Sequence, residues 1–275
     1  VLNSHWAAGA TVVLSGDSVM QKPFWEQLRT HACTSLAGVP FTFQLLERVG
    51  FRTMDLPSLT TLQQAGGALD RTLTQTYGEH MAARGGRLVV MYGQTEATAR
   101  MAWLPPHRLA DKLGSAGVAV PGGAFEIADG ADEGEVVYRG PNVMLGYATE
   151  AADLARGDDL GGVLHTGDLG RLDDEGFLFL TGRSARIAKV FGLRLNLDDV
   201  ETVLREGGPA AAVGGTDVVW GFCAYGTDES LADEARRLAK RYRIHPSAFR
   251  LRRVDEIPST SSGKVDYERV RRWTS

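Results

Sequence analysis

The chain has 275 residues, of which 43% are hydrophobic and 23% are charged, and its net charge is -4. This composition is typical of a globular protein with a large core, and it excludes a protein held to nucleic acid by an overall basic field. No apolar run reaches the roughly 18 residues that cross a bilayer, no secretory signal opens the chain, and Cys33 and Cys223 lack a paired spacing, so we expect a cytoplasmic protein with no membrane span and no nucleic-acid partner.

Short apolar runs alternate with helical patterns in the first part of the chain. The opening residues have the pattern of a helix interior that leads into a strand, as expected for a chain cut within a domain. Alternation of strands and helices predicts an α/β fold for this part. The predicted strands cover residues 11–14 and 88–91, and the predicted helices cover residues 24–31, 41–49 and 69–83.

Residues 114–182 differ from the first part, because strands follow one another closely with tight turns between them. Strands are predicted at residues 135–138 and 177–180, and the turn at residues 173–176 is rich in Asp and Gly. This spacing predicts a β-rich subdomain.

A small α+β pattern begins near residues 183–185, where we expect a domain boundary. Its first elements are a hairpin at residues 186–195 that turns at Gly192, and a helix capped by Asn196. The remaining predicted elements are a strand at residues 221–225, a helix with a capping box of Ser230 and Asp233, and a short basic helix at residues 267–273.

Five polar or small residues follow the apolar strand at residues 88–91. In α/β proteins the carboxyl ends of strands carry ligand sites. Tyr92 could stack on a base, Thr95 could bond a phosphate oxygen, and Glu96 could hold Mg²⁺, so the group fits a nucleotide with its metal. An ordinary transition from strand to loop gives the same residues, and this motif alone does not decide between the two.

Three shorter motifs are compatible with the same ligand. Asp168 carries a carboxylate, which accepts the two hydrogen bonds that a ribose diol donates. Arg183 adds a permanent cation, while Gly66, Gly67 and Ala68 would let a flat ring lie on the backbone. Each motif also has an ordinary interpretation: the Asp168 motif as a turn, Arg183 as part of a surface ion pair, and the glycine segment as a loop.

A single lysine, Lys264, follows Ser261, Ser262 and Gly263 ahead of the basic helix. Small polar neighbours predict a flexible loop, and a compact ammonium group can meet negative charge that develops only during a reaction. A solvated turn is the alternative. The sequence lacks the G-x-G-x-x-G, G-x-S-x-G, H-E-x-x-H and complete P-loop patterns, so the common dinucleotide, hydrolase, zincin and P-loop interpretations are excluded.

In their order, these motifs resemble the adenylate-forming superfamily of acyl-CoA synthetases, peptide-synthetase adenylation domains and luciferases. The segment from Tyr92 to Glu96 matches the family's Y-G-x-T-E core, and the segment from Gly134 to Tyr147 is similar to its G-E…G-Y element. The further matches are the adenine-contacting segment at Gly66, Gly67 and Ala68, the T-G-D motif ending at Asp168, the start of the hinge at Gly182 and Arg183, the K-x-x-G motif at Lys189 and Gly192, and the catalytic-lysine loop at Lys264.

The resemblance implies an α/β fold of two parts. The end of a large adenylate-forming N-terminal domain, with its β-rich subdomain, would occupy residues 1–182. A hinge would follow at residues 183–185, and residues 186–275 would form a small mobile α+β domain that carries the catalytic Lys264.

The resemblance also implies a two-step ligase. A small-molecule carboxylic acid would attack ATP to give an acyl-adenylate, with Lys264, Thr95 and Glu96 as catalytic residues and Mg²⁺ at Glu96. Rotation of the small domain would then bring Lys189 and Gly192 toward a thiol, which is that of CoA or of phosphopantetheine on an acyl carrier protein. The nucleotide would contact Gly66, Gly67, Ala68, Tyr92, Gly93, Asp168 and Arg183.

Two features depart from the family. Ala185 stands where the hinge commonly has Asp or Lys, and the Ser/Thr/Gly-rich phosphate loop does not occur in these residues. The chain therefore resembles the C-terminal portion of such an enzyme, and by itself we expect it to be a poor catalyst.

Several alternatives stay open. For the thiol, CoA is preferred to a carrier protein. A second alternative is adenylation followed by transfer to another nucleophile. A third is a noncatalytic relative that only binds a nucleotide. The identity of the acid is not fixed, although the resemblance implies a mostly apolar pocket suited to an aryl or alkyl acid, in which Phe43 and Met101 could equally be ordinary core. Its predicted lining is Phe43, Gly66, Gly93, Ala97 and Met101.

Overall fold

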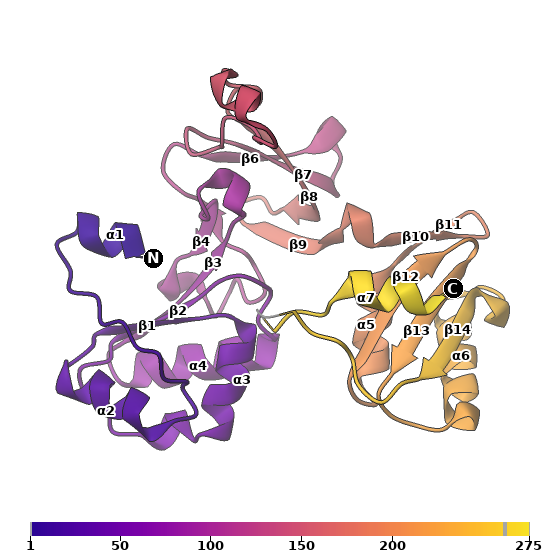
Figure 1. The fold of residues 1–275 in the computed structure, drawn as a ribbon, viewed down its shortest axis with the longest axis horizontal. Helices are drawn as coiled ribbons and strands as arrows, with labels where there is room; N and C mark the ends of the chain where they lie inside the picture. The colour runs from indigo at the N-terminus through magenta and orange to yellow at the C-terminus, as the bar shows by residue number, and fades with distance from the viewer. Residues whose placement is uncertain (1, 261–262, 275) are drawn as a thin grey trace. The chain divides into compact units, whose positions relative to one another are not determined.

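The computed structural model describes residues 2–260 and 263–274 (Figure 1). Ser261 and Ser262 of the predicted lysine loop lie outside the described residues, as do Val1 and Ser275. The chain divides into two compact units, which we describe separately. The first comprises Val1–Thr166 and Gly170–Leu180, and the second comprises Gly167–Leu169 and Thr181–Ser275.

A five-stranded mixed sheet organises the first unit. Its strands follow the order β1-β2-β3-β4-β5, and the first three are parallel because helices connect them. The last two strands run antiparallel to their neighbours. The strands are β1 (Ser35–Gly38), β2 (Thr61–Gln64), β3 (Arg87–Tyr92), β4 (Ala102–Leu104) and β5 (Val118–Ala119).

Helices α2 (Lys22–Thr30), α3 (Pro40–Arg48) and α4 (Arg71–Ala83) pack against this sheet (Figure 1), which confirms the three predicted helices. Helix α4 begins where the Asp70 carboxylate accepts a hydrogen bond from the Leu73 amide. One apolar core joins helices and strands, and its members include Trp25, Leu28, Phe43, Leu46, Leu62, Tyr77, Met81 and Leu88.

A four-stranded sheet of order β6-β7-β8-β9 confirms the predicted β-rich segment. The turn before its last strand is held by Asp173, whose carboxylate accepts hydrogen bonds from the amides of Glu175 and Phe177. Gly176 there adopts φ +78°, which glycine tolerates best. The strands are β6 (Ala124–Ile127), β7 (Gly134–Arg139), β8 (Val163–Leu172) and β9 (Leu178–Arg183).

The second unit opens with the predicted hairpin. Strands β10 (Ile187–Val190) and β11 (Leu193–Asn196) pair antiparallel around Phe191 and Gly192, which have φ angles of +49° and +82°. Two successive left-handed residues match the twist of a tight hairpin turn. Helix α5 (Leu197–Arg205) then starts at the predicted cap, where the Asn196 side chain accepts a hydrogen bond from the Asp198 amide at 2.9 Å.

A three-stranded sheet of order β12-β13-β14 separates two apolar cores in this unit. Residues of α5 and α6 (Asp228–Tyr242) fill the core on one face, and α7 (Tyr267–Arg271) contributes Val270 to the core on the other. The strands are β12 (Ala210–Gly215), β13 (Val218–Cys223) and β14 (Phe249–Arg253).

Three sequence predictions need correction. Residues 11–14 form no strand and pair with no strand of the described chain, and Leu14 is exposed, because β propensity gives a strand only where the backbone finds a partner. The helix at Leu231 begins earlier, since Thr227 is its cap and Ser230 is the third residue of its capping box. The strand predicted at residues 221–225 likewise starts earlier, at Val218.

Helix α1 (Leu2–Ala7) bears out the helical pattern of the opening residues. Within the described residues, every helix is too short or too polar to span a bilayer.

We expect trypsin to test the predicted hinge at residues 183–185. The Arg183 side chain is 63% exposed, whereas Arg186 is buried, so cleavage should follow Arg183 and release a C-terminal fragment of about 90 residues. Electrophoresis and mass spectrometry of a short digest identify the fragment. Cleavage at exposed arginines elsewhere, with Arg183 left intact, would count against a mobile linker.

Candidate functional site

Two of the predicted nucleotide-binding segments leave the first sheet at the carboxyl ends of its parallel strands. Strand β2 ends at Gln64, just before Gly66, and the neighbouring parallel strand β3 ends at Tyr92. Neighbouring parallel strands present their carboxyl ends on one side, which is where open α/β sheets bind ligands. The structure therefore brings the Gly66 segment and the Tyr92 segment to the same end of the sheet.

The segment after β2 is held by a buried glutamine. Gln64 is 1% exposed, and its side-chain amide donates a hydrogen bond to the Gly67 carbonyl at 2.7 Å. Gly66 has φ +82°, and a Cβ there would lie 3.2 Å from Val39 Cγ1, so the site favours glycine twice over. This fixed backbone offers a flat surface at the strand end.

The loop after β3 turns back tightly at Gly93. A Cβ at Gly93 would come within 2.6 Å of the Ala99 carbonyl oxygen, so only glycine fits there. Thr95–Ala97 then form one 3-10 turn, and Thr98 and Ala99 both adopt positive φ angles. Such strain in residues other than glycine is kept where surrounding contacts overdetermine the backbone.

Those surrounding contacts come from the β-rich segment. The Asn142 side-chain amide donates to the carbonyls of Ala97 and Arg100, each at 2.8 Å, and its oxygen accepts from the Tyr138 hydroxyl. The Thr98 hydroxyl donates to the Asn142 carbonyl at 2.8 Å. Asn142 therefore fixes the loop that carries Thr95 and Glu96.

Glu96 is held at both its backbone and its side chain. The Met144 amide donates to the Glu96 carbonyl at 2.7 Å, and the Tyr147 hydroxyl donates to the carboxylate at 2.6 Å. That hydrogen bond raises the pKa of Tyr147, so its hydroxyl stays protonated and keeps donating at neutral pH. Thr95 beside it is exposed.

The donor set suits Mg²⁺ only together with a phosphate ligand. The described residues contain no group of three or more His, Cys, Asp or Glu side chains that could hold a metal. Mg²⁺ in phosphate-transfer sites is commonly bound by one or two carboxylates plus the substrate's own phosphates. A single carboxylate at Glu96 fits a site in which the substrate's phosphates supply the other ligands.

Asp168 lies on β8, in the second unit, and is 4% exposed. Arg183 Nε donates to its Oδ1 at 2.7 Å, and the preceding Gly167 has φ +68°. The Ser184 hydroxyl donates to the Gly167 carbonyl at 3.1 Å. The predicted ribose-binding residue and the predicted cation are therefore brought together as an ion pair.

The predicted thiol-side residues lie on the hairpin β10–β11. Lys189 is exposed on β10, and Gly192 is exposed at the turn. The turn is tied down where the Phe191 amide donates to the Asp217 carboxylate at 2.8 Å. Phe191 and Leu193 are both exposed beside it, which gives the hairpin an apolar tip.

Lys264 is exposed, but the ends of its loop are paired. Ser259 forms an antiparallel bridge with Val265, and the Thr260 amide donates to the Lys264 carbonyl at 2.7 Å. The Gly263 amide donates to the Thr260 carbonyl at 2.9 Å. The described residues on both sides of the predicted loop are thus paired with each other, and the Lys264 side chain is exposed.

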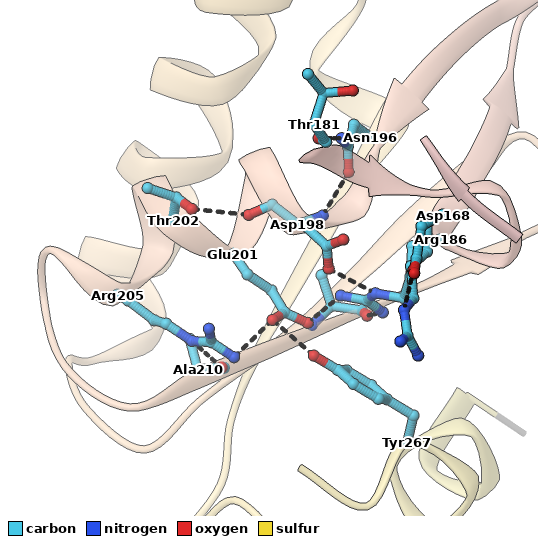
Figure 2. A network of polar contacts seen from close by, with 12 residues as sticks. Asp168, Thr181, Arg186, Asn196, Asp198, Glu201, Thr202, Arg205, Ala210 and Tyr267 are labelled. Atoms are coloured by element: carbon cyan, nitrogen blue, oxygen red, sulfur yellow. Dashed lines mark hydrogen bonds and ion pairs between the residues drawn. The ribbon is translucent and has the colours of Figure 1, made fainter. Parts of the chain in front are cut away.

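Sequence analysis missed a buried polar network in the second unit (Figure 2). The Glu201 side chain is 2% exposed and accepts from Arg186, from Arg205 at 2.6 Å, from the Tyr267 hydroxyl at 2.8 Å and from the Ala212 amide at 2.8 Å. Arg186 also donates to Asp198 and to the Ala212 carbonyl. The sequence did contain one sign of this network, a charged residue on an apolar helix face. Glu201 follows Leu197 by four residues and so lies on the apolar face of α5.

The predicted acyl-pocket residues fall into separate places. Phe43 is 1% exposed and packs edge-on against Tyr77, with ring centroids 5.1 Å apart, in the core beneath the first sheet. Ala97 and Met101 are buried in another cluster with Tyr138. The structure does not bring Phe43 to these two residues, and the pocket remains a prediction.

Comparison with known proteins identifies the family of the chain. The profile of the family described as AMP-binding enzyme matches residues 1–148. The indoleacetate–CoA ligase of Aromatoleum aromaticum is 30% identical over 96% of this chain and 54% of the relative. The chain spans about half the length of the curated relatives it matches.

Solved structures show the same fold. The amide bond synthetase McbA from Marinactinospora thermotolerans is 31% identical with a TM-score of 0.74, over 98% of this chain and 57% of that one. The o-succinylbenzoate coenzyme A synthetase of Bacillus subtilis, in complex with ATP and magnesium, is 25% identical with a TM-score of 0.76, over 98% and 58%. Since the family profile covers more than half of its residues, the chain belongs to the AMP-binding enzymes of the adenylate-forming superfamily.

Proposed function

We propose that this chain is part of an AMP-forming ligase that activates a carboxylic acid with ATP and transfers the acyl group to a thiol, that of CoA in the first instance. The proposal rests on the arrangement of loops at the carboxyl ends of β2 and β3. There the glycine segment after β2 lies beside the loop of Thr95 and Glu96 after β3, and both backbones accept hydrogen bonds from side-chain amides. Family relatives named as CoA ligases support the same activity.

The residues at this end of the sheet suit the adenine ring, the phosphate and the metal of a bound nucleotide. The backbone of Gly66 and Gly67 would receive the adenine ring, with Tyr92 beside it. The Thr95 hydroxyl would donate to a phosphate oxygen, and Glu96 would hold Mg²⁺, which supplies positive charge to the phosphates when bound. The backbone after β2 and the Glu96 side chain are held by hydrogen bonds before the nucleotide binds, which reduces the entropic cost of binding.

The second unit would supply the remaining groups. The Asp168 carboxylate would accept from the ribose diol while the Arg183 side chain donates to its Oδ1. Lys264 would donate to the oxygens on which charge builds as the acid attacks the α-phosphate. Lys189 and Gly192, on the hairpin, would face the thiol in the second step.

An amine acceptor is the second candidate. The chain resembles an amide bond synthetase in structure at 31% identity, as closely as it resembles the CoA ligases. The adenylation residues would be the same in either case. Only the group that attacks the acyl-adenylate would differ.

Product analysis tests both candidates. The full-length protein is incubated with ATP, Mg²⁺ and a panel of aryl and alkyl acids, and either CoA or a set of amines is added. We expect AMP and an acyl-CoA thioester by mass spectrometry. Formation of an amide and no thioester would select the second candidate, and release of ADP in place of AMP would contradict both.

Asp168→Ala should weaken AMP binding by about 1.5–3 kcal/mol, the range for hydrogen bonds to a charged group. Calorimetric titration of AMP measures the change. Glu126→Ala is a matched control, because Glu126 also pairs with an arginine across neighbouring strands, Arg139, but lies on β6 and outside the proposed site. Equal affinities of the Asp168 variant and the native protein would remove the ribose role.

A further inference from the structure

Two functional segments of the second unit are tied to one buried carboxylate. Arg186 lies just before β10, the strand that carries Lys189, and Tyr267 lies at the start of α7, just after the Lys264 loop. Both side chains donate to Glu201 on α5 (Figure 2). The hairpin and the lysine loop are therefore joined through Glu201.

Tyr267 makes two distinct contacts with this network. Its hydroxyl donates to Glu201 Oε2 at 2.8 Å, and its ring lies 4.0 Å from the Arg186 guanidinium. Burial, together with the Glu201 charge, raises the pKa of Tyr267 to about 12, so the hydroxyl is protonated at neutral pH. Removal of the hydroxyl alone would break the first contact and keep the second.

A short backbone path leads from Tyr267 to Lys264. The Asp266 amide donates to the Pro258 carbonyl at 2.9 Å, Val265 bridges to Ser259, and the Lys264 carbonyl accepts from the Thr260 amide. Helix α7 has only five residues, too few to be stable by itself, so tertiary contacts must hold it in place. The Tyr267 hydroxyl provides one polar contact of this kind.

We propose that Tyr267 is a positioning residue for Lys264, and that its hydrogen bond to Glu201 sets the lysine loop relative to the strand that carries Lys189. The inference rests on the proposed function, in which Lys264 acts in adenylation. It assigns no contact with substrate to Tyr267. The network links the lysine loop and the hairpin through Glu201.

Tyr267→Phe tests this, with Tyr225→Phe as a matched control. Tyr225 is also half-buried and donates its hydroxyl to α5, at the Leu204 carbonyl, but packs on the opposite face of the sheet. Both variants keep an aromatic ring, so both should fold. Amide hydrogen exchange is measured for the loop at Thr260, Gly263 and Asp266, and the two half-reactions are measured on the full-length protein.

Tyr267→Phe should speed exchange at these loop amides more than Tyr225→Phe does. Adenylate formation should lose about 10-fold in kcat with KM for the acid unchanged, since a small misplacement of a catalytic group lowers rate and spares binding. Thioester formation from supplied acyl-adenylate should be unaffected.

Two results would overturn the inference. One is equal exchange in the two variants, which means only a global loss of stability, and the other is an adenylation rate in Tyr267→Phe equal to that of the native protein. If the native protein forms no adenylate with any acid, the proposed function fails, and the exchange comparison still decides whether Tyr267 holds the loop.

Discussion

Lys264→Ala in the full-length protein should reduce adenylate formation by at least about 100-fold, the scale for losing one group that stabilises developing charge. Lys264 is exposed next to Val265, which is bridged to Ser259, so the substitution removes the ammonium group and leaves this backbone pairing intact. Pyrophosphate exchange measures this step. Thioester formation from supplied acyl-adenylate should change much less, because we propose that the hairpin residues serve the second step.

Lys240→Ala is the control for this prediction, since Lys240 is an exposed lysine of the same unit on α6, away from the loop. Equal losses in the two half-reactions of the Lys264 variant would contradict the assignment of Lys264 to one step. No loss in either half-reaction would favour a noncatalytic nucleotide-binding protein.

Arg186→Met should destabilise the chain by about 3–5 kcal/mol, the cost of removing one partner from a buried ion pair. The Arg186 side chain is 8% exposed and contacts two carboxylates, Asp198 and Glu201. Its loss would leave the buried Glu201 charge with fewer donors. The midpoint of guanidinium unfolding, with its slope, measures the change.

Arg237→Met provides the comparison at the surface. Arg237 also pairs with two carboxylates, Glu206 and Glu234, but its side chain is 54% exposed. Exposed ion pairs contribute about 0–1 kcal/mol, so this variant should unfold close to the native midpoint. Similar midpoints for the two variants would show that the Arg186 network contributes little to stability.

Much of the fold follows from local patterns in the sequence. Helices α2, α3 and α4 have an apolar face, and the hairpin at Gly192 has the left-handed turn that such a residue permits. The strand predicted at residues 11–14 failed because strand pairing depends on a distant partner, which local propensity does not report. The cap of α6 was misplaced because Ser230 bonds as the third residue of the box and Thr227 as its cap.

The site was predictable only in part. Motif order predicts Glu96, Asp168 and Lys264 as site residues, since chemistry restricts which residue types can fill those positions, and their roles stay predictions. The sequence could not show that Tyr147 and Asn142 hold the Glu96 loop, because these contacts join residues more than forty positions apart. Nor could it show that Phe43 and Met101 are buried in separate clusters.

Acid-dependent exchange of labelled pyrophosphate into ATP measures whether the full-length protein forms an acyl-adenylate. A panel of aryl and alkyl acids is offered to the full-length protein with ATP and Mg²⁺, and exchange is followed for the native chain and for Glu96→Gln. We expect exchange that requires one of these acids and that falls by at least about 100-fold in the Glu96 variant. Exchange that proceeds equally in both proteins, or its absence with every acid despite tight ATP binding, would contradict this expectation.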